Sequence, residues 1–159
     1  MNAHDKKKCE ELFAHISMVL AENGMVFPTY IMILGGQVVP VMVNPQEEMS
    51  LSEYEGVVNQ AAIEMQPDAM ILISEQWMVS KHKDDPEVQL LVDGIIKPSD
   101  QDDKEEYLVL IITERDGNSN SLVAKIEKDP IGTRFIREQH WIDSCVSNLI
   151  RPWKVTEVK

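Results

Sequence analysis

One seven-residue stretch, YLVLIIT at residues 107–113, limits the folds that this chain can adopt. Side chains of a β-strand point alternately to its two faces, and here both alternating sets are apolar. A strand with one solvent-exposed face instead alternates apolar and polar residues. We therefore predict that residues 107–113 form a central strand that is covered on both sides.

Two amphipathic helices are predicted ahead of this strand, each from apolar residues that recur at helical spacing. The first helix ends at Asn23-Gly24, because Asn and Gly accept the left-handed backbone of a helix C-cap. The second has Ser52 and Glu55 as a capping box at its start, and Pro67 ends it. The apolar stripes are Cys9, Leu12, Phe13, Ile16, Val19 and Leu20 in the first helix, and Leu51, Tyr54, Val57, Val58, Ala61, Ala62 and Met65 in the second.

The other strands are predicted from alternation and from turn residues. The segments FPTYIMIL and QVVPVMV flank Gly35-Gly36, which favours a two-residue hairpin because both glycines accept a positive φ. Pro40 cannot donate a ladder hydrogen bond, so the second strand of this hairpin is expected at a sheet edge. Further strands are expected at ILISEQWMV (71–79), at SLVAKIEK (121–128) and near residues 133–138.

The resulting order is helix, two strands, helix, three or four strands, helix. Hairpin connections favour antiparallel pairing, and helices are needed to cover the apolar face of the sheet. We predict a single α+β domain over residues 1–159, with a mainly antiparallel sheet of about five or six strands, two long helices and a short C-terminal helix. A polar insertion at about 80–106 carries a short helix that starts at Asp85-Pro86-Glu87. The C-terminal helix contains Ile142, Cys145, Val146, Leu149 and Ile150 and ends at Arg151-Pro152.

Composition and charge argue against several classes of partner. The 159 residues are 43% apolar, which is enough for one domain with a sizeable core. A formal charge of -12 argues against a nucleic acid or an anionic membrane surface, since both are held by clustered Lys and Arg. No segment reaches the roughly 20 apolar residues of a membrane span. The N-terminus also lacks the apolar region of a secretion signal, so we expect a cytoplasmic protein with reduced thiols at Cys9 and Cys145.

Glu75 is the charged residue that fits its predicted strand least well. If side chains alternate regularly, Glu75 shares a face with Ile73 and Trp77, where an ionised and unpaired carboxylate costs several kcal/mol. It then needs a partner, a raised pKa or protonation, and such groups are candidates for function. The other interpretation is a bulge between Ser74 and Gln76 that returns Glu75 to solvent. We expect the strand to kink, and Glu75 to reach solvent or to cap neighbouring backbone.

Several segments resemble a group of small uncharacterised bacterial proteins. The strand end Ser74-Glu75-Gln76-Trp77-Met78 is similar to their Ser-Glu-Ala-Trp-Met element, with Gln76 in place of Ala. Pro98-Ser99 and the acidic residues after it are similar to their Pro-Ser element. The turn Glu114-Arg115-Asp116-Gly117 is similar to the Glu-Asp-Arg-Asp-Gly that closes an apolar strand in those proteins. The resemblance covers the middle of the chain and implies no known activity, and the residues that it singles out are Glu75, Trp77, Met78, Arg115 and Asp116.

The predicted element order also resembles that of the roadblock family of dimerisation modules, which is helix, two strands, helix, three strands, helix. This likeness is one of arrangement, and no motif is shared. An arrangement of elements does not imply a function.

The patterns that could carry catalysis or metal binding are incomplete. Ser74, His82 and Asp84 or Asp85 could be a nucleophile, a base and an orienting acid, but Ser74 lacks the Gly-x-Ser-x-Gly elbow. The acidic loop at residues 100–105 has Lys and Glu where an EF-hand calcium loop needs Asp or Asn followed by Gly. Its mixture of acidic residues and Lys is typical of a solvated loop. Neither cysteine has a neighbouring His or cluster of Lys to make a thiolate, and Gly35-Gly36 lacks a phosphate-binding pattern. We therefore expect no catalytic residue, no cofactor and no metal ion. The loop donors considered for a metal are His82, Asp84, Asp85, Asp100, Asp102 and Asp103.

Trp141 and Trp153 lie in the one region that is both basic and aromatic, together with Arg134, Arg137, Arg151 and Lys154. Aromatic residues and Arg are enriched at interface hot spots, although both Trp side chains could equally pack against the sheet. We expect a non-catalytic cytoplasmic module for interaction or scaffolding, homodimeric or bound to another protein. The alternative is a metal-assisted hydrolase that uses Glu75 and the loop aspartates.

Overall fold

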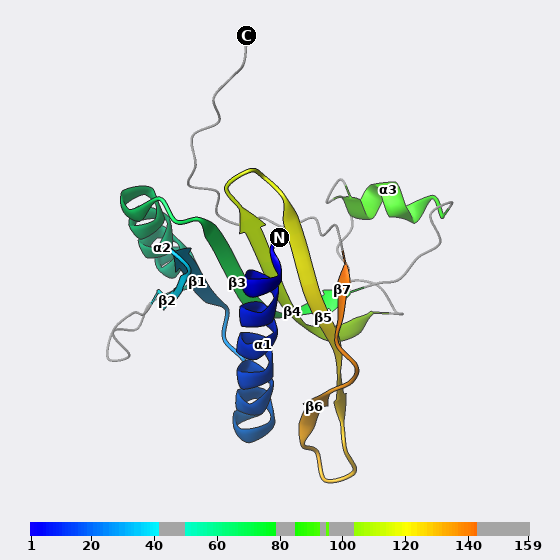
Figure 1. Cartoon of the computed structure of the whole chain (residues 1–159). Helices are drawn as coiled ribbons and strands as arrows, with labels where there is room; N and C mark the ends of the chain where they lie inside the picture. The colour runs from blue at the N-terminus through cyan, green and yellow to red at the C-terminus, as the bar shows by residue number, and fades with distance from the viewer. Residues whose placement is uncertain (42–49, 79–84, 93–94, 96–103, 143–159) are drawn as a thin grey trace.

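The computed structural model describes residues 1–41, 50–78, 85–92, 95 and 104–142 (Figure 1). These residues form an α+β fold, as the sequence predicts. The elements in chain order are α1 (Ala3–Asn23), β1 (Thr29–Leu34), β2 (Gln37–Pro40), α2 (Leu51–Met65), β3 (Ala69–Met78), α3 (Glu87–Val92), β4 (Glu105–Glu114), β5 (Ser119–Lys128), β6 (Arg134–Ile136) and β7 (His140–Ile142).

The strands form one antiparallel sheet in the order β2-β1-β3-β4-β5-β6, and β7 also pairs with β5. The central position of β4 and the edge position of β2 are confirmed. The described sheet has seven strands, so the predicted number of five or six is too low. The missed strand is β7, which has three residues and is too short to show a period. Ile142 therefore ends a strand, and the rest of the predicted C-terminal helix lies outside the described residues.

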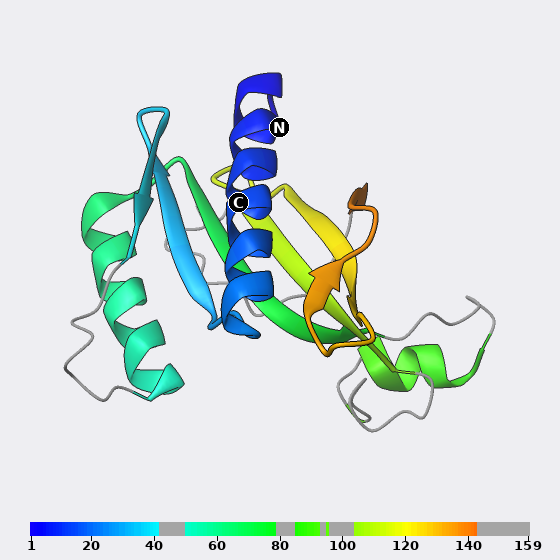
Figure 2. The same cartoon turned by 90° about the horizontal axis from the view of Figure 1, so that it is seen from below.

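Helices cover both faces of the sheet (Figures 1 and 2). The face under α1 carries one set of alternating strand residues, and the face under α2 carries the other set. On β4 the two sets are Leu108, Leu110 and Ile112 on the α1 face, and Val109 and Ile111 on the α2 face. All five are at most 1% exposed, which explains why residues 108–112 are apolar on both faces of the strand.

Local signals placed the first helix and the hairpin correctly. The helix α1 ends at Gly24 with a φ of 77°, which is the predicted left-handed cap. Gly35 and Gly36 have φ values of 54° and 80°, as the two central residues of a type I′ hairpin require. Leu34 and Gln37 pair directly across this turn.

The start of α2 differs from the prediction by two residues. Ser50 is the N-cap, and its hydroxyl accepts a hydrogen bond from the Glu53 amide at 3.2 Å. The sequence Ser-x-x-Glu occurs both at 50–53 and at 52–55, so the capping-box rule selected the wrong copy. The buried stripe is also narrower than predicted, because only Val58 and Ala62 are fully buried. Residues of the predicted stripe that are exposed instead are Leu51, Val57 and Met65.

The Tyr54 hydroxyl of α2 lies between the two strands of the hairpin. It accepts a hydrogen bond from the Tyr30 amide at 3.1 Å and donates one to the Val41 carbonyl at 2.9 Å. The Val41 amide donates directly to the Tyr30 carbonyl at 2.9 Å. The hydroxyl therefore replaces one ladder hydrogen bond and connects α2 to the sheet edge.

Replacing Tyr54 with Phe is expected to lower the free energy of unfolding by about 1–3 kcal/mol, since it leaves a buried amide and a buried carbonyl without this partner. Urea denaturation followed by circular dichroism measures the change. Tyr107→Phe is the matched control, because that hydroxyl donates to the exposed Glu105 carboxylate. Equal stabilities of the two variants would contradict the bridging role of Tyr54.

Candidate functional site

Glu75 remains on the apolar face of β3. The pairing of β3 with β4 is unbroken from Ala69 to Met78, with Glu75 opposite Leu108. The predicted bulge between Ser74 and Gln76 is therefore wrong. The Glu75 side chain is 22% exposed, so it lies at the boundary of the core on the side of α1.

Both carboxylate oxygens of Glu75 have partners. Oε1 lies 2.5 Å from Arg134 Nη2, and Oε2 accepts a hydrogen bond from the Val26 amide at 2.8 Å. The expectation that Glu75 caps neighbouring backbone is confirmed by the second contact. The charge is thus compensated within the fold, which is why a regular strand can keep it.

Arg134 is held by more than one partner. Its Nη2 also lies 2.6 Å from Oε2 of Glu106, and its Nη1 donates to the Gly24 carbonyl at 2.9 Å. We call Glu75, Glu106 and Arg134 the Arg134 cluster. Burial alone lowers the pKa of Arg134, but the hydrogen bonds and charges of Glu75 and Glu106 outweigh it, so the pKa lies above its usual value.

The Arg134 cluster is poorly suited to acid–base or metal chemistry. A general base needs a free lone pair near its substrate, and the Glu75 oxygens are occupied by a guanidinium and an amide. Among the described residues, no three His, Cys, Asp or Glu side chains come together as metal ligands. The cluster therefore acts as a link between chain segments.

A small pocket of about 220 Å³ lies beside the cluster, lined by Glu75, Gln76, Trp77 and Glu106. Trp77 is 42% exposed, and the Lys104 ammonium lies 5.1 Å from the centre of an indole ring. Met78 ends β3 opposite Glu105. The Trp-bearing strand end therefore presents aromatic surface to solvent.

Arg115 and Asp116 lie near the start of β3, at the end of the sheet opposite Trp77. Both side chains make hydrogen bonds that hold neighbouring chain segments in place. The Arg115 guanidinium donates to the carbonyls of Gln66 and Pro67, just after α2. Asp116 accepts hydrogen bonds from the backbone and the side chain of Asn118, both at 2.9 Å. The two motif residues thus hold the end of α2 and the turn between β4 and β5. Pro98-Ser99, the third part of the resemblance, lies outside the described residues.

Trp141 packs against the core instead of standing free. Its indole N–H donates to Glu10 of α1 at 3.1 Å, and the Lys6 ammonium lies 5.9 Å from a ring centre. The ring contacts the cluster of buried residues under α1. The packing interpretation therefore describes Trp141, while Trp153 lies outside the described residues.

The described residues give little support to the catalytic and metal-binding patterns considered from the sequence. The Ser74 side chain is buried and its hydroxyl accepts a hydrogen bond from Gln76 at 2.9 Å. Asp85 accepts from the Glu87 amide at 2.9 Å, at the start of α3, whose presence the sequence predicted. The other candidates, namely His82, Asp84, Asp100, Asp102 and Asp103, lie outside the described residues.

Cys9 is fully buried under α1. Burial, followed by the charges of Asp5, Glu10 and Glu114, raises the pKa of its thiol to about 12. A thiol that stays protonated is a poor nucleophile. Cys9 is therefore a core residue, as predicted, and Cys145 lies outside the described residues.

Cys9 should make the fold less stable at alkaline pH. The unfolded thiol ionises near 9.0 and the folded thiol near 12, so the unfolded chain holds fewer protons between these values. The free energy of unfolding then falls as pH rises above 9, by up to about 1.4 kcal/mol per pH unit. Urea denaturation at pH 8 to 10 should show a shallower decline for Cys9→Ala than for the natural chain. Equal slopes would show that the folded thiol ionises normally.

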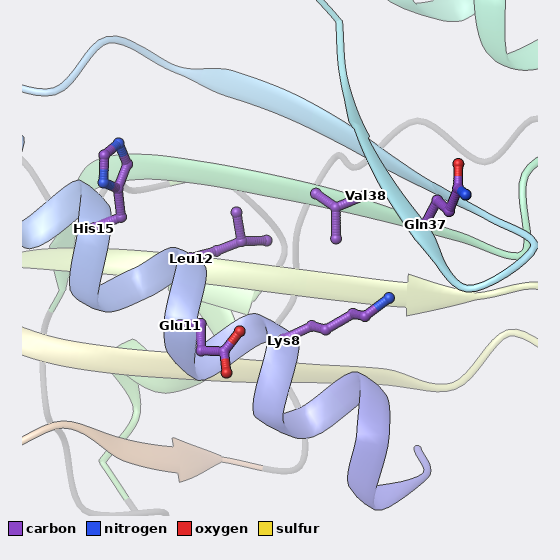
Figure 3. Close-up of a pocket in the computed structure, with 6 residues that line it drawn as sticks. All are labelled: Lys8, Glu11, Leu12, His15, Gln37 and Val38. Carbon is purple, nitrogen blue, oxygen red and sulfur yellow. The ribbon is translucent and has the colours of Figure 1, made fainter.

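A second and larger hollow, of about 540 Å³, lies between α1 and the edge strand β2 (Figure 3). Leu12 and Val38 give it an apolar floor, and the other lining residues are Lys8, Glu11, His15 and Gln37. These side chains come from a helix and a hairpin that sequence patterns predict separately. Their proximity is set by tertiary packing, so no sequence pattern predicts this hollow.

Three exposed apolar residues belong to the chain segments that meet at the Arg134 cluster. Met25 is 47% exposed, Phe27 is 71% exposed and Trp77 is 42% exposed. The amide of Val26, which lies between Met25 and Phe27, donates a hydrogen bond to Glu75. Glu75 lies two residues before Trp77 on the same face of β3. We call Met25, Phe27 and Trp77 the strand-end surface. Phe27 is not among the predicted surface residues, because the sequence pattern places it in a strand that begins only at Thr29.

Comparisons with protein-family models, with curated proteins and with solved structures give no match for this chain. Within the described residues, no helix combines the length and the apolar content that crossing a membrane requires.

Proposed function

We propose that the protein is a non-catalytic cytoplasmic interaction module that forms a homodimer, or binds another protein, through the strand-end surface. The observation that carries this proposal is the joint exposure of Met25, Phe27 and Trp77 at one end of the sheet. Apolar groups that gather on a surface are typical of binding sites, and Trp is enriched among the residues that dominate binding energy. The formal charge of -12 favours a protein partner over a nucleic acid or an anionic membrane.

The alternative function, a metal-assisted hydrolase, needs Glu75 as a ligand or as a base. The contacts of Glu75 with Arg134 and the Val26 amide argue against both roles. Thermal unfolding with and without magnesium, manganese or zinc separates the two functions. An interaction module predicts no shift of the midpoint, and a clear rise would favour the hydrolase.

Sedimentation equilibrium over a range of protein concentrations tests the homodimer. Phe27→Ser and Trp77→Ser are each expected to weaken self-association by about tenfold or more, which corresponds to about 1.4 kcal/mol or more. Ile63→Ser is the matched control, because Ile63 is 49% exposed on α2 and lies away from this surface. A natural chain that stays monomeric would contradict the homodimer. A dimer that all three variants leave unchanged would contradict the assignment of the surface.

A further inference from the structure

The loop between α1 and β1 carries two of the three residues of the strand-end surface. Residues 24–28 precede β1, so strand pairing does not hold them. Two of their backbone groups are bound by side chains from distant parts of the sequence instead. The Gly24 carbonyl accepts from Arg134, and the Val26 amide donates to Glu75. Gly24 and Val26, the residues on either side of Met25, are thus tied to the Arg134 cluster.

The same guanidinium also holds the hairpin of β5 and β6. Arg134 is the first residue of β6, which follows the turn at Asp129–Thr133. Its contact with Glu106 reaches the residue that pairs with Trp77 across β3 and β4. One side chain thus joins the α1–β1 loop, the ends of β3 and β4, and the β5–β6 hairpin.

We propose that Arg134 is a positioning residue whose contacts with Gly24, Glu75 and Glu106 hold residues 24–28 and the β5–β6 hairpin against the end of β3. We call these three contacts the latch, and we call the latch closed when all three are made. The strand-end surface is assembled for binding only while the latch is closed. This inference rests on the proposed function. Arginine suits the role because its planar fork directs several donors at once, here to two carboxylates and one carbonyl. A lysine ammonium is a single point charge on a flexible stem and cannot hold the three acceptors in the same way.

The latch should link binding to the order of the hairpin. A partner that contacts Met25 and Phe27 stabilises the closed arrangement of residues 24–28. Through Glu75 and Arg134 it then also stabilises the start of β6. Because such coupling is reciprocal, loosening β6 must weaken the partner.

Hydrogen exchange of the full chain tests the latch without a partner. In Arg134→Met and Arg134→Lys, the Val26 amide and the amides of residues 129 and 131–134 should exchange about tenfold faster, the factor expected from losing one charge-assisted hydrogen bond. Amides at the centre of β4 should be unchanged, which separates a local opening from general unfolding. Arg137→Met is the matched control, since Arg137 bonds to Glu127 on the neighbouring strand and is 65% exposed. Unchanged exchange at Val26 in the Arg134 variants would overturn the latch.

Two carboxylate variants test the route of the coupling. Glu75→Gln should speed exchange at Val26 and at 129–134, because Glu75 contacts both the loop and Arg134. Glu106→Gln should speed exchange at 129–134 and leave Val26 nearly unchanged, because no contact joins Glu106 directly to the loop among the described residues. Identical effects of the two variants on Val26 would overturn the assigned route.

Sedimentation equilibrium of Arg134→Met tests the effect on binding. Self-association should weaken about tenfold, comparably to Phe27→Ser, although all three surface residues remain in place. If Phe27→Ser weakens the dimer and Arg134→Met does not, the positioning role is wrong and the proposed function stands. If the natural chain does not associate with itself or with another protein, the proposed function fails, and the binding role of Arg134 fails with it.

Discussion

Replacing Phe13 with Ala is expected to lower the free energy of unfolding by about 3–5 kcal/mol. Phe13 is fully buried at the centre of the contact between α1 and the sheet, so the substitution leaves a cavity that the surrounding strands cannot fill. Domains of this size have a total stability of about 5–15 kcal/mol, and the variant therefore loses a large part of it. Guanidinium denaturation followed by circular dichroism measures the loss.

Met18→Ala on the same helix is the control for this measurement. Met18 is 61% exposed, so its replacement is expected to change stability by about 0.5 kcal/mol or less. A Phe13→Ala chain within about 1 kcal/mol of the natural chain would show that α1 does not pack on the sheet as described.

Replacing Glu75 with Ala is expected to cost about 2–4 kcal/mol. The substitution removes one of two carboxylates from Arg134, whose side chain is only 14% exposed, and takes the acceptor from the Val26 amide. The full penalty for breaking a buried pair is reduced here, because Glu106 still contacts Arg134 and both carboxylates are partly solvated. Urea denaturation at neutral pH measures the change.

Glu127→Ala is the matched comparison for Glu75→Ala. Glu127 also contacts an arginine, Arg137, at 2.5 Å, but the Arg137 side chain is 65% exposed. Surface pairs of this kind contribute about 0–1 kcal/mol. If both variants lose the same stability, Glu75 is an ordinary surface carboxylate and does not link chain segments.

Features set by local rules could be predicted from the sequence. The glycine pair at 35–36 fixes a hairpin, Gly24 ends a helix, and the doubly apolar pattern of 107–113 places β4 inside the sheet. The errors came from local signals that were ambiguous or too short. Two copies of Ser-x-x-Glu competed at the start of α2, and β7 has three residues.

The partners of Glu75 could not be predicted, because they are distant in the sequence. Alternation correctly placed it on the apolar face, but the Val26 amide lies 49 residues away and the guanidinium comes from a strand beyond β5. A bulge is favoured by the sequence because bulges are common at strand ends and no nearby residues complete a site around Glu75. In the same way, the residues of the strand-end surface become neighbours only when the α1–β1 loop meets the end of β3.

A double-mutant cycle on Glu75 and Arg134 tests the central claim most directly. The claim is that this carboxylate links chain segments through its contact with Arg134. Urea denaturation of Glu75→Gln, Arg134→Met and the double variant should give a coupling energy of about 1–3 kcal/mol, while the exposed pair Asp68 and Arg115 should give about 0.5 kcal/mol or less. Additive effects of the Glu75 and Arg134 substitutions, within about 0.3 kcal/mol, would contradict the claim.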